Sequence, residues 1–277
     1  MVQRIIVAAV GIPFLLFVFC VCPPWATALF LLALCVVGAY ELSRAILPWE
    51  KVKKTFAMTA ALSCLTVSAP YWQNDTKTLL CVIPWLYAML LLLVFGYMVA
   101  EYGKADALSF YDVCAILMAG IVIPLALSCL LRLRLLNYGG GMVLIPSVAA
   151  FCSDSAALFG GMFFGQRKLA PLVSPKKTVE GAVSGLAGGM LGMILFRIVF
   201  FLVTEVPLHI GWCMLMGLVG SAVGQLGDLA FSCIKRERGI KDYSRLLPGH
   251  GGVLDRFDSV IFAAPVLWLI VSRAAFY

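Results

Sequence analysis

The sequence predicts an all-α integral membrane protein with about nine transmembrane helices. Of its 277 residues, 62% are hydrophobic and only 13% are charged, and the mean hydropathy is +1.01. A soluble domain carries roughly a quarter charged residues, so this composition excludes an ordinary soluble protein. A membrane helix needs about 20 apolar residues, which leaves room for roughly nine spans with short loops and no separate soluble domain.

The first part of the chain, residues 1–141, contains apolar segments without recognisable chemistry. Cys22-Pro23-Pro24-Trp25 lacks the small residues of a signal-peptide cleavage site, so we interpret the first two segments as a retained helical hairpin. Glu41 lies near the end of the second segment and is interpreted as a helix-end charge in preference to a buried partner. The predicted spans here cover residues 5–22, 25–46, 55–72, 79–100 and 113–131.

The second part, residues 142–277, is predicted to be the catalytic region, with spans at 142–165, 180–203, 209–230 and 258–275. Two of these spans carry small residues at intervals of four, such as Gly185 and Gly189 in one and Gly217 and Ser221 in the other. Small residues at this spacing let membrane helices pack closely. Close packing would bring the polar ends of these spans together.

The distribution of positive charge predicts that the N-terminus is cytoplasmic. With nine spans, 16 of the 21 Lys and Arg residues fall on the N-terminal side of the membrane and four on the other, with Arg197 inside a span. Cytoplasmic loops carry such an excess of basic residues. The net charge of +7 suits anionic lipids and nucleotides as partners, and nothing in the sequence indicates nucleic-acid binding.

Asp154 and a basic loop are the first candidates for chemistry. An aspartate within an apolar span costs roughly 3 kcal/mol on insertion scales, so Asp154 should face a polar cavity, a reading favoured over a structural hydrogen bond. The loop that follows ends in a group suited to an anion at a helix start: Ser174, Lys176, Lys177 and Thr178. The alternative is a topogenic loop that ends in an ordinary N-cap at Thr178.

The densest polar stretch covers residues 232–259. Asp255 and Asp258 are three apart, so on a helix they share a face and suit a hard divalent cation. Gly251 and Gly252 just before them would let backbone N–H groups approach an anion. Positive charge for phosphate comes from four residues, Lys235, Arg236, Lys241 and Arg256. Upstream, a single helix face should carry Asp228, Ser232 and Lys235. A solvated cytoplasmic loop would explain the basic residues alone, but not the aspartates or the glycines.

This stretch resembles the signature of the phosphatidate cytidylyltransferases, also called CDP-diacylglycerol synthases. The matching runs are Ser232-x-Ile234-Lys235-Arg236, then Lys241-Asp242-x-Ser244, then Leu247-Pro248-x-His250-Gly251-Gly252-Val253-x-Asp255-Arg256-Phe257-Asp258. Three shorter segments are also similar to the family: Asp154-Ser155-x-Ala157, Ser174-Pro175-Lys176-Lys177-Thr178-Val179-Glu180-Gly181 and Gly227-Asp228-Leu229. Leu158 departs from the family, which commonly has an aromatic residue there.

The resemblance implies that CTP and phosphatidate give CDP-diacylglycerol and pyrophosphate with Mg2+, a second cation being left open. The implied metal ligands are Asp228, Asp255 and Asp258. Phosphate and headgroup would be bound by Lys177, Lys235, Arg236, Lys241 and Arg256, with Asp154, Ser174, Lys176, Thr178, Ser232, Gly251 and Gly252 lining the substrate site. His250 either contacts phosphate or donates a proton, or is a satisfied turn histidine.

The expected setting is a bacterial inner membrane, with a polar cavity open to the cytoplasm and to lipid, and a homodimer is left open. Two other functions are considered. A CTP-dependent polyprenol or phytol kinase would use similar groups but would have to activate a hydroxyl. A non-enzymatic cation-coupled transporter would use Asp154 and Asp228 as ion ligands within the membrane. Neither explains the whole motif at 232–258.

Overall fold

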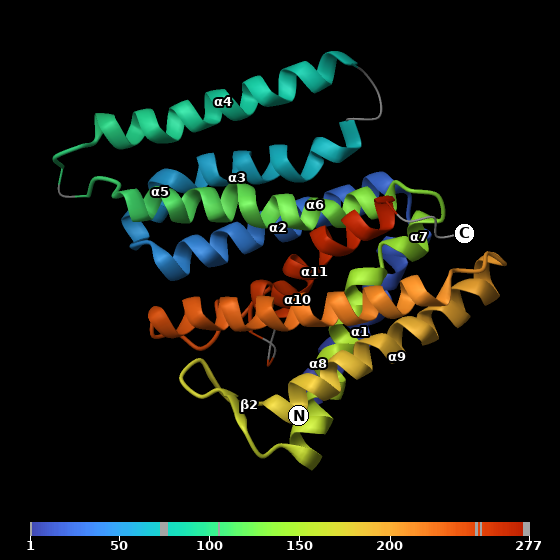
Figure 1. Ribbon diagram of the computed structural model, residues 1–277. Helices are drawn as coiled ribbons and strands as arrows, with labels where there is room; N and C mark the ends of the chain where they lie inside the picture. The colour runs from blue at the N-terminus through green and yellow to red at the C-terminus, as the bar shows by residue number, and fades with distance from the viewer. Residues whose placement is uncertain (1, 73–76, 105, 247–248, 250, 274–277) are drawn as a thin grey trace. The chain divides into compact units, whose positions relative to one another are not determined.

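The computed structural model describes residues 2–72, 77–104, 106–246, 249 and 251–273 (Figure 1). The chain forms two compact units. The N-terminal unit contains Met1–Val18, Cys22–Arg132 and Ile240–Arg256. The C-terminal unit contains Phe19–Val21, Leu133–Gly239 and Phe257–Tyr277. These units do not follow a single cut near residue 141, because the chain returns to the N-terminal unit with residues 240–256.

The N-terminal half of the chain is helical throughout its apolar segments. Its elements are α1 (Val2–Leu16), a π-helical turn η1 (Phe17–Val21), α2 (Pro24–Ile46), α3 (Trp49–Trp72), α4 (Lys77–Ala100), α5 (Phe110–Leu117), a second π-helical turn η2 (Met118–Val122) and α6 (Ile123–Arg134). Helix α3 packs against α2 and η2. The core between these elements includes fully buried Leu62, Val94 and Ile116.

Helix α3 contains several hydroxyl side chains, and these form hydrogen bonds inside the protein. Thr59, Ser63 and Thr66 are buried, and each donates to the carbonyl oxygen four residues earlier in α3. Ser63 and Thr66 also lie 3.3 and 3.4 Å from the carbonyl oxygens of Ala119 and Gly120 in η2. These contacts satisfy polar groups where the π-helical turn disturbs the regular bonding of the helix.

The C-terminal half contains the longest helices and a small sheet. Its elements are α7 (Gly139–Met142), α8 (Ile145–Phe164), β1 (Lys168–Ala170), β2 (Ser174–Thr178), α9 (Val179–Thr204), α10 (Ile210–Glu237) and α11 (Leu254–Arg273). Helix α9 runs beside both α8 and α10 (Figure 1). A Cβ on Gly189 of α9 would lie 2.8 Å from the carbonyl oxygen of Gly217 in α10. The predicted close packing along the glycine stripes is therefore confirmed.

All of the predicted spans are found as helices, and five are long and apolar enough to cross a membrane in the described part of the chain. These five are Pro24–Ile46, Phe110–Arg134, Gly139–Phe164, Val179–Thr204 and Ile210–Glu237. The all-α membrane class is thus supported, while the count of about nine spans stays a prediction. One feature was not predicted. Strands β1 and β2 pair antiparallel in the segment that we had interpreted as a loop.

Candidate active site

The end of helix α10 presents the predicted polar face. Ser232 donates to Oδ1 of Asp228, one turn earlier, at 3.4 Å. Ser232 and Lys235 are both buried, each with 8% of its surface exposed. Asp228, Ser232 and Lys235 lie on one continuous helix, because α10 extends to Glu237. The sequence had predicted that this span ends at residue 230.

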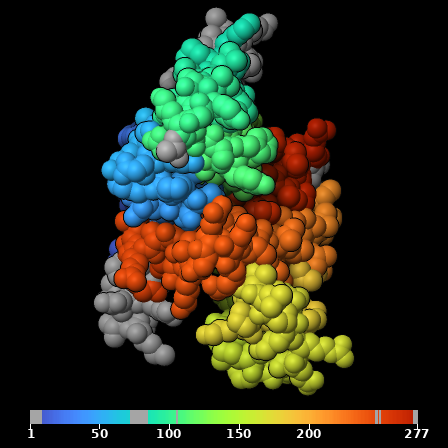
Figure 2. Space-filling model, turned by 90° about the vertical axis from the view of Figure 1, so that its left-hand side faces the viewer, coloured from blue at the N-terminus to red at the C-terminus, as the bar shows by residue number. Residues whose placement is uncertain are grey.

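The β1–β2 hairpin brings the second motif to this face of α10. Lys177, on β2, forms an ion pair through its Nζ with Oδ2 of Asp228. Arg236 of α10 stabilises the hairpin turn, because its Nε donates a hydrogen bond to the carbonyl oxygen of Val173 at 3.1 Å. Figure 2 shows the hairpin, in yellow, projecting from the C-terminal unit. The expectation that helix packing joins the two motifs is therefore confirmed for Lys177 and Asp228.

The hairpin is also tied to the start of α9. Thr178 is the N-cap of α9, and its Oγ1 accepts a hydrogen bond from the N–H of Gly181 at 3.1 Å. Glu180 accepts from the N–H of Gln166 at 3.0 Å and of Arg167 at 3.2 Å. Lys176 is exposed on β2, whereas Lys177 is half-buried and points to α10. Lys177 is thus the better placed of the two lysines.

Asp258 adds a buried carboxylate in the C-terminal unit. It has 8% of its surface exposed, and its Oδ1 accepts from the N–H of Ser259 at 2.7 Å. The carboxylates of Asp228 and Asp154 repel its charge, and the Lys235 ammonium attracts it. Asp258 therefore lies within electrostatic range of aspartates on α8 and α10. Asp154 itself is exposed on α8, beside buried Ser153.

Asp255 is held differently, within the N-terminal unit. Its side chain is buried, and its Oδ2 accepts hydrogen bonds from the backbone N–H groups of Tyr243 and Gly252, both at 2.9 Å. Gly251 has a φ of +84°, and a Cβ there would lie 2.9 Å from Oδ2 of Asp255. Asp255 therefore joins the two ends of the loop that carries it.

Glu41 is the residue that the sequence interpretation misjudged. We expected a helix-end charge, but Glu41 is only 2% exposed and accepts hydrogen bonds from residues of the signature. The backbone N–H groups of Val253 and Leu254 donate to it at 3.0 and 2.9 Å. The sequence held one signal, an acidic residue inside an apolar run, but no indication of its partner. The N–H groups that were expected to approach an anion thus meet carboxylates here, and their part in phosphate binding stays a prediction.

The carboxylates of this region suit a hard divalent cation by their chemistry, since Mg2+ prefers oxygen ligands. Asp228 and Asp258 repel each other in a largely buried setting, which a cation would relieve. Among the described residues, no set of three or more His, Cys, Asp or Glu side chains is arranged to hold a metal. Lys241 and Arg256 are exposed in the N-terminal unit, and His250 lies outside the described residues.

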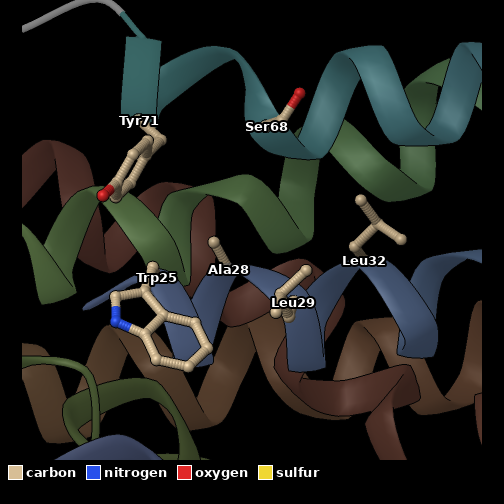
Figure 3. Close-up of a pocket in the computed structure, with 6 residues that line it drawn as sticks. All are labelled: Trp25, Ala28, Leu29, Leu32, Ser68 and Tyr71. Carbon is tan, nitrogen blue, oxygen red and sulfur yellow. The ribbon is translucent and has the colours of Figure 1, made fainter. Parts of the chain in front are cut away.

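A cavity of about 270 Å³ lies in the N-terminal unit, and no residue of the predicted site lines it. Its lining comes from α2 and α3 (Figure 3): Trp25, Ala28, Leu29, Leu32, Ser68 and Tyr71. Nearly all of this surface is apolar. It therefore suits hydrocarbon better than a charged nucleotide, and the polar cavity expected from the sequence stays a prediction.

These groups belong to an all-α membrane protein in which a lysine and an aspartate from two motifs pair at the ends of apolar helices. The model of the Cytidylyltransferase family matches residues 2–273, and the chain belongs to this family. The resemblance drawn from the motifs is therefore confirmed.

Curated relatives agree with this assignment. A phosphatidate cytidylyltransferase of Pseudomonas aeruginosa is 36% identical over 279 residues, covering 98% of this chain and 97% of the relative. One from Bacillus subtilis is 38% identical over 188 residues, covering 68% of this chain and 66% of the relative. One from Staphylococcus saprophyticus is 32% identical over 218 residues, covering 77% and 78%.

Proposed function

We propose that this protein is a phosphatidate cytidylyltransferase, which makes CDP-diacylglycerol and pyrophosphate from CTP and phosphatidate. The observation that carries this proposal is the ion pair between Lys177 of β2 and Asp228 of α10, which joins two motifs of the family in one place. The family match over nearly the whole chain supports it. A lipid kinase and a transporter are not favoured by these relatives.

The reaction requires an attack in line with the leaving group. A phosphate oxygen of phosphatidate bonds to the α-phosphorus of CTP, and the bond to the bridging oxygen breaks, so that pyrophosphate leaves with the electron pair. The nucleophile is already an anion, and no strong general base is needed. The task of the protein is therefore to position two anionic substrates and to offset their charge.

Bound Mg2+, held by Asp228 and Asp255 with Asp258 as a further ligand or a partner that orients them, would neutralise charge on the attacking and leaving oxygens. The basic side chains would do the rest. Lys177 exchanges its bond to Asp228 for a phosphate oxygen, and Lys235 offsets charge from the buried side of α10. Arg236 keeps the hairpin in place. Exposed Lys241 and Arg256 would bind the lipid headgroup, and Ser174, Lys176, Thr178 and Ser232 would line the triphosphate site.

The same proposal extends to the membrane. We expect about nine spans with the N-terminus in the cytoplasm, and a polar cavity that opens to the cytoplasm and to lipid. Both substrates would then meet at the inner surface of a bacterial cytoplasmic membrane, where CTP is present. A homodimer is compatible with this arrangement and stays a prediction.

The test follows label from CTP into lipid. Purified protein in detergent is given phosphatidate and Mg2+, with CTP labelled at either the α- or the γ-phosphorus. We expect only the α-label to enter the organic phase, and only with phosphatidate present. A lipid kinase would transfer the γ-label to an alcohol instead. If folded wild-type protein left both labels in water, the proposal would be wrong.

The site is tested in the same assay with Asp228→Asn. Loss of this charge should reduce the rate by about 10²–10³-fold, the range for removing one group that stabilises transition-state charge. The matched control is Asp106→Asn, which removes an exposed carboxylate paired with Lys54 in the N-terminal unit. Its activity should equal that of wild type. Full activity in Asp228→Asn would exclude this aspartate from the site.

A further inference from the structure

We propose that Glu41 of helix α2 is a positioning residue that fixes the signature loop, defined here as residues 241–246 and 251–256. This inference rests on the proposed cytidylyltransferase function, because it concerns how the loop is held for that reaction. Glu41 lies about 200 residues before the loop in sequence, and both belong to the N-terminal unit. No motif discussed above contains Glu41.

The contacts of Glu41 engage both sides of the loop. Oε1 accepts from the hydroxyl of Ser244 at 2.6 Å and from the N–H of Val253 at 3.0 Å. Oε2 accepts from the N–H of Leu254 at 2.9 Å. One carboxylate thus makes three hydrogen bonds, and two of them come from Val253, just before α11, and Leu254, its first residue. The positive end of a helix favours a negative charge at this place.

The surrounding backbone is shaped around this carboxylate. A Cβ on Gly252 would lie 2.7 Å from both oxygens of Glu41, so only glycine admits the carboxylate this close. One turn earlier on the same face of α2, a Cβ on Gly38 would lie 3.1 Å from the side chain of fully buried Leu254. Gly38 and Glu41 therefore both contact Leu254, at the start of α11.

Glu41 and Asp255 each accept hydrogen bonds from backbone N–H groups at the start of α11. Asp255 accepts from the N–H of Gly252, and Glu41 accepts from the next two N–H groups of the chain. Three consecutive backbone donors are thus saturated by carboxylates of the protein. We infer that phosphate is bound through side chains of the loop, while Glu41 sets where Asp255 stands. Glu41 acts through Asp255 and does not touch the substrate.

The test compares Glu41→Gln with wild type. Glutamine keeps one oxygen for Ser244 and Val253, but it turns an NH2 group toward the N–H of Leu254 or leaves that donor unpaired. We expect kcat to fall about tenfold, equivalent to about 1.4 kcal/mol, with the KM for CTP nearly unchanged. The Mg2+ concentration for half-maximal activity should rise about tenfold, as for the loss of partners that orient metal ligands. A smaller fraction of folded enzyme would not move that concentration.

A second readout does not depend on activity. Amide hydrogen exchange at Leu254 should become faster in Glu41→Gln, while α2 and α10 keep their protection. The matched control is Glu50→Gln, an exposed carboxylate on α3 in the same unit that pairs only weakly with Lys53 at 3.2 Å. This control should leave kcat, the Mg2+ requirement and the exchange unchanged.

Ser244→Ala tests the contact from the loop side, should Glu41→Gln accumulate poorly. It removes one donor to Glu41 and should lower kcat about threefold, a loss at the lower end of the range for a typical hydrogen bond. In the double variant the two losses should not multiply, because both change the hydrogen bonds of the same side chain at position 41. An active wild type with unchanged kinetics and exchange in Glu41→Gln would overturn the role of Glu41. An inactive wild type would instead count against the proposed function.

Discussion

At the residue scale, the acidic side chains of this protein hold structure and offer chemistry at the same time. Asp255 illustrates the overlap, because the oxygen that closes the signature loop belongs to a carboxylate that we also propose as a metal ligand. Asp228 likewise pairs with Lys177 while facing Asp258. A substitution that removes the whole side chain therefore changes two properties together. Isosteric substitutions are needed to separate them.

Asp255→Asn and Asp255→Ala should differ for this reason. Asparagine retains an oxygen for the N–H groups of Tyr243 and Gly252, so its thermal midpoint should stay near that of wild type, while activity falls about 10²-fold or more with the lost charge. Alanine leaves two buried donors unpaired and should also destabilise the protein by about 1–3 kcal/mol. Thermal unfolding in detergent and the α-label assay measure the two effects. An active Asp255→Asn would show that the loop contact is the whole role of Asp255.

The residue scale is also where sequence reasoning reached its limit. The proximity of Lys177 and Asp228 could be predicted, because both residues lie in motifs at the ends of helices with glycine stripes. Glu41 was not, because its partner Ser244 is 203 positions away and an isolated acidic residue does not indicate which donors will surround it. Likewise, Gly251 and Gly252 indicated a close approach to an oxygen, but the oxygens belong to Asp255 and Glu41 in this structure.

At the scale of elements, hydropathy located the helices because about 20 apolar residues must form one in lipid. It missed the β1–β2 hairpin, since its strands are short and include Pro175 and three lysines. The hairpin is held by contacts with other elements: Glu180 of α9, Arg236 of α10, and Asp228 of α10 through Lys177. Such a short element gains its stability from contacts that lie in other elements.

The packing of α9 against α10 decides whether the hairpin and α10 meet, and Gly189→Ala should disturb it. Its Cβ would lie 1.7 Å from Oγ of Ser221 and 2.8 Å from the carbonyl oxygen of Gly217, so the helices must move apart. We expect a loss of about 1–3 kcal/mol in stability, as for other overpacked sites. Gly96→Ala on α4 is the control, because a Cβ there meets nothing within 4 Å. An equal thermal midpoint for both variants would contradict the close packing.

At the scale of the whole molecule, the chain passes more than once between its two units, and helix α11 changes unit between Arg256 and Phe257. The signature is therefore carried by both units, with Asp255 in one and Asp258 in the other. The N-terminal helices had seemed to lack chemistry because no motif lies in them. Helix α2 nevertheless supplies the carboxylate that holds the start of α11. At this scale, we expect the distribution of Lys and Arg along the chain to set its orientation in the membrane.

We expect the orientation in the membrane to follow from that charge, because the proposed topology puts most basic residues on the side of the proposed active site. CTP is too polar to cross a bilayer, so inside-out membrane vesicles that contain the protein should convert added CTP without detergent. Right-side-out vesicles should be inactive until detergent opens them, after which both preparations should reach the same rate. The comparison needs no variant, and the detergent-treated rate controls for the amount of protein. Equal rates before detergent treatment, in sealed vesicles, would contradict a cytoplasmic site and the N-terminal orientation that we infer with it.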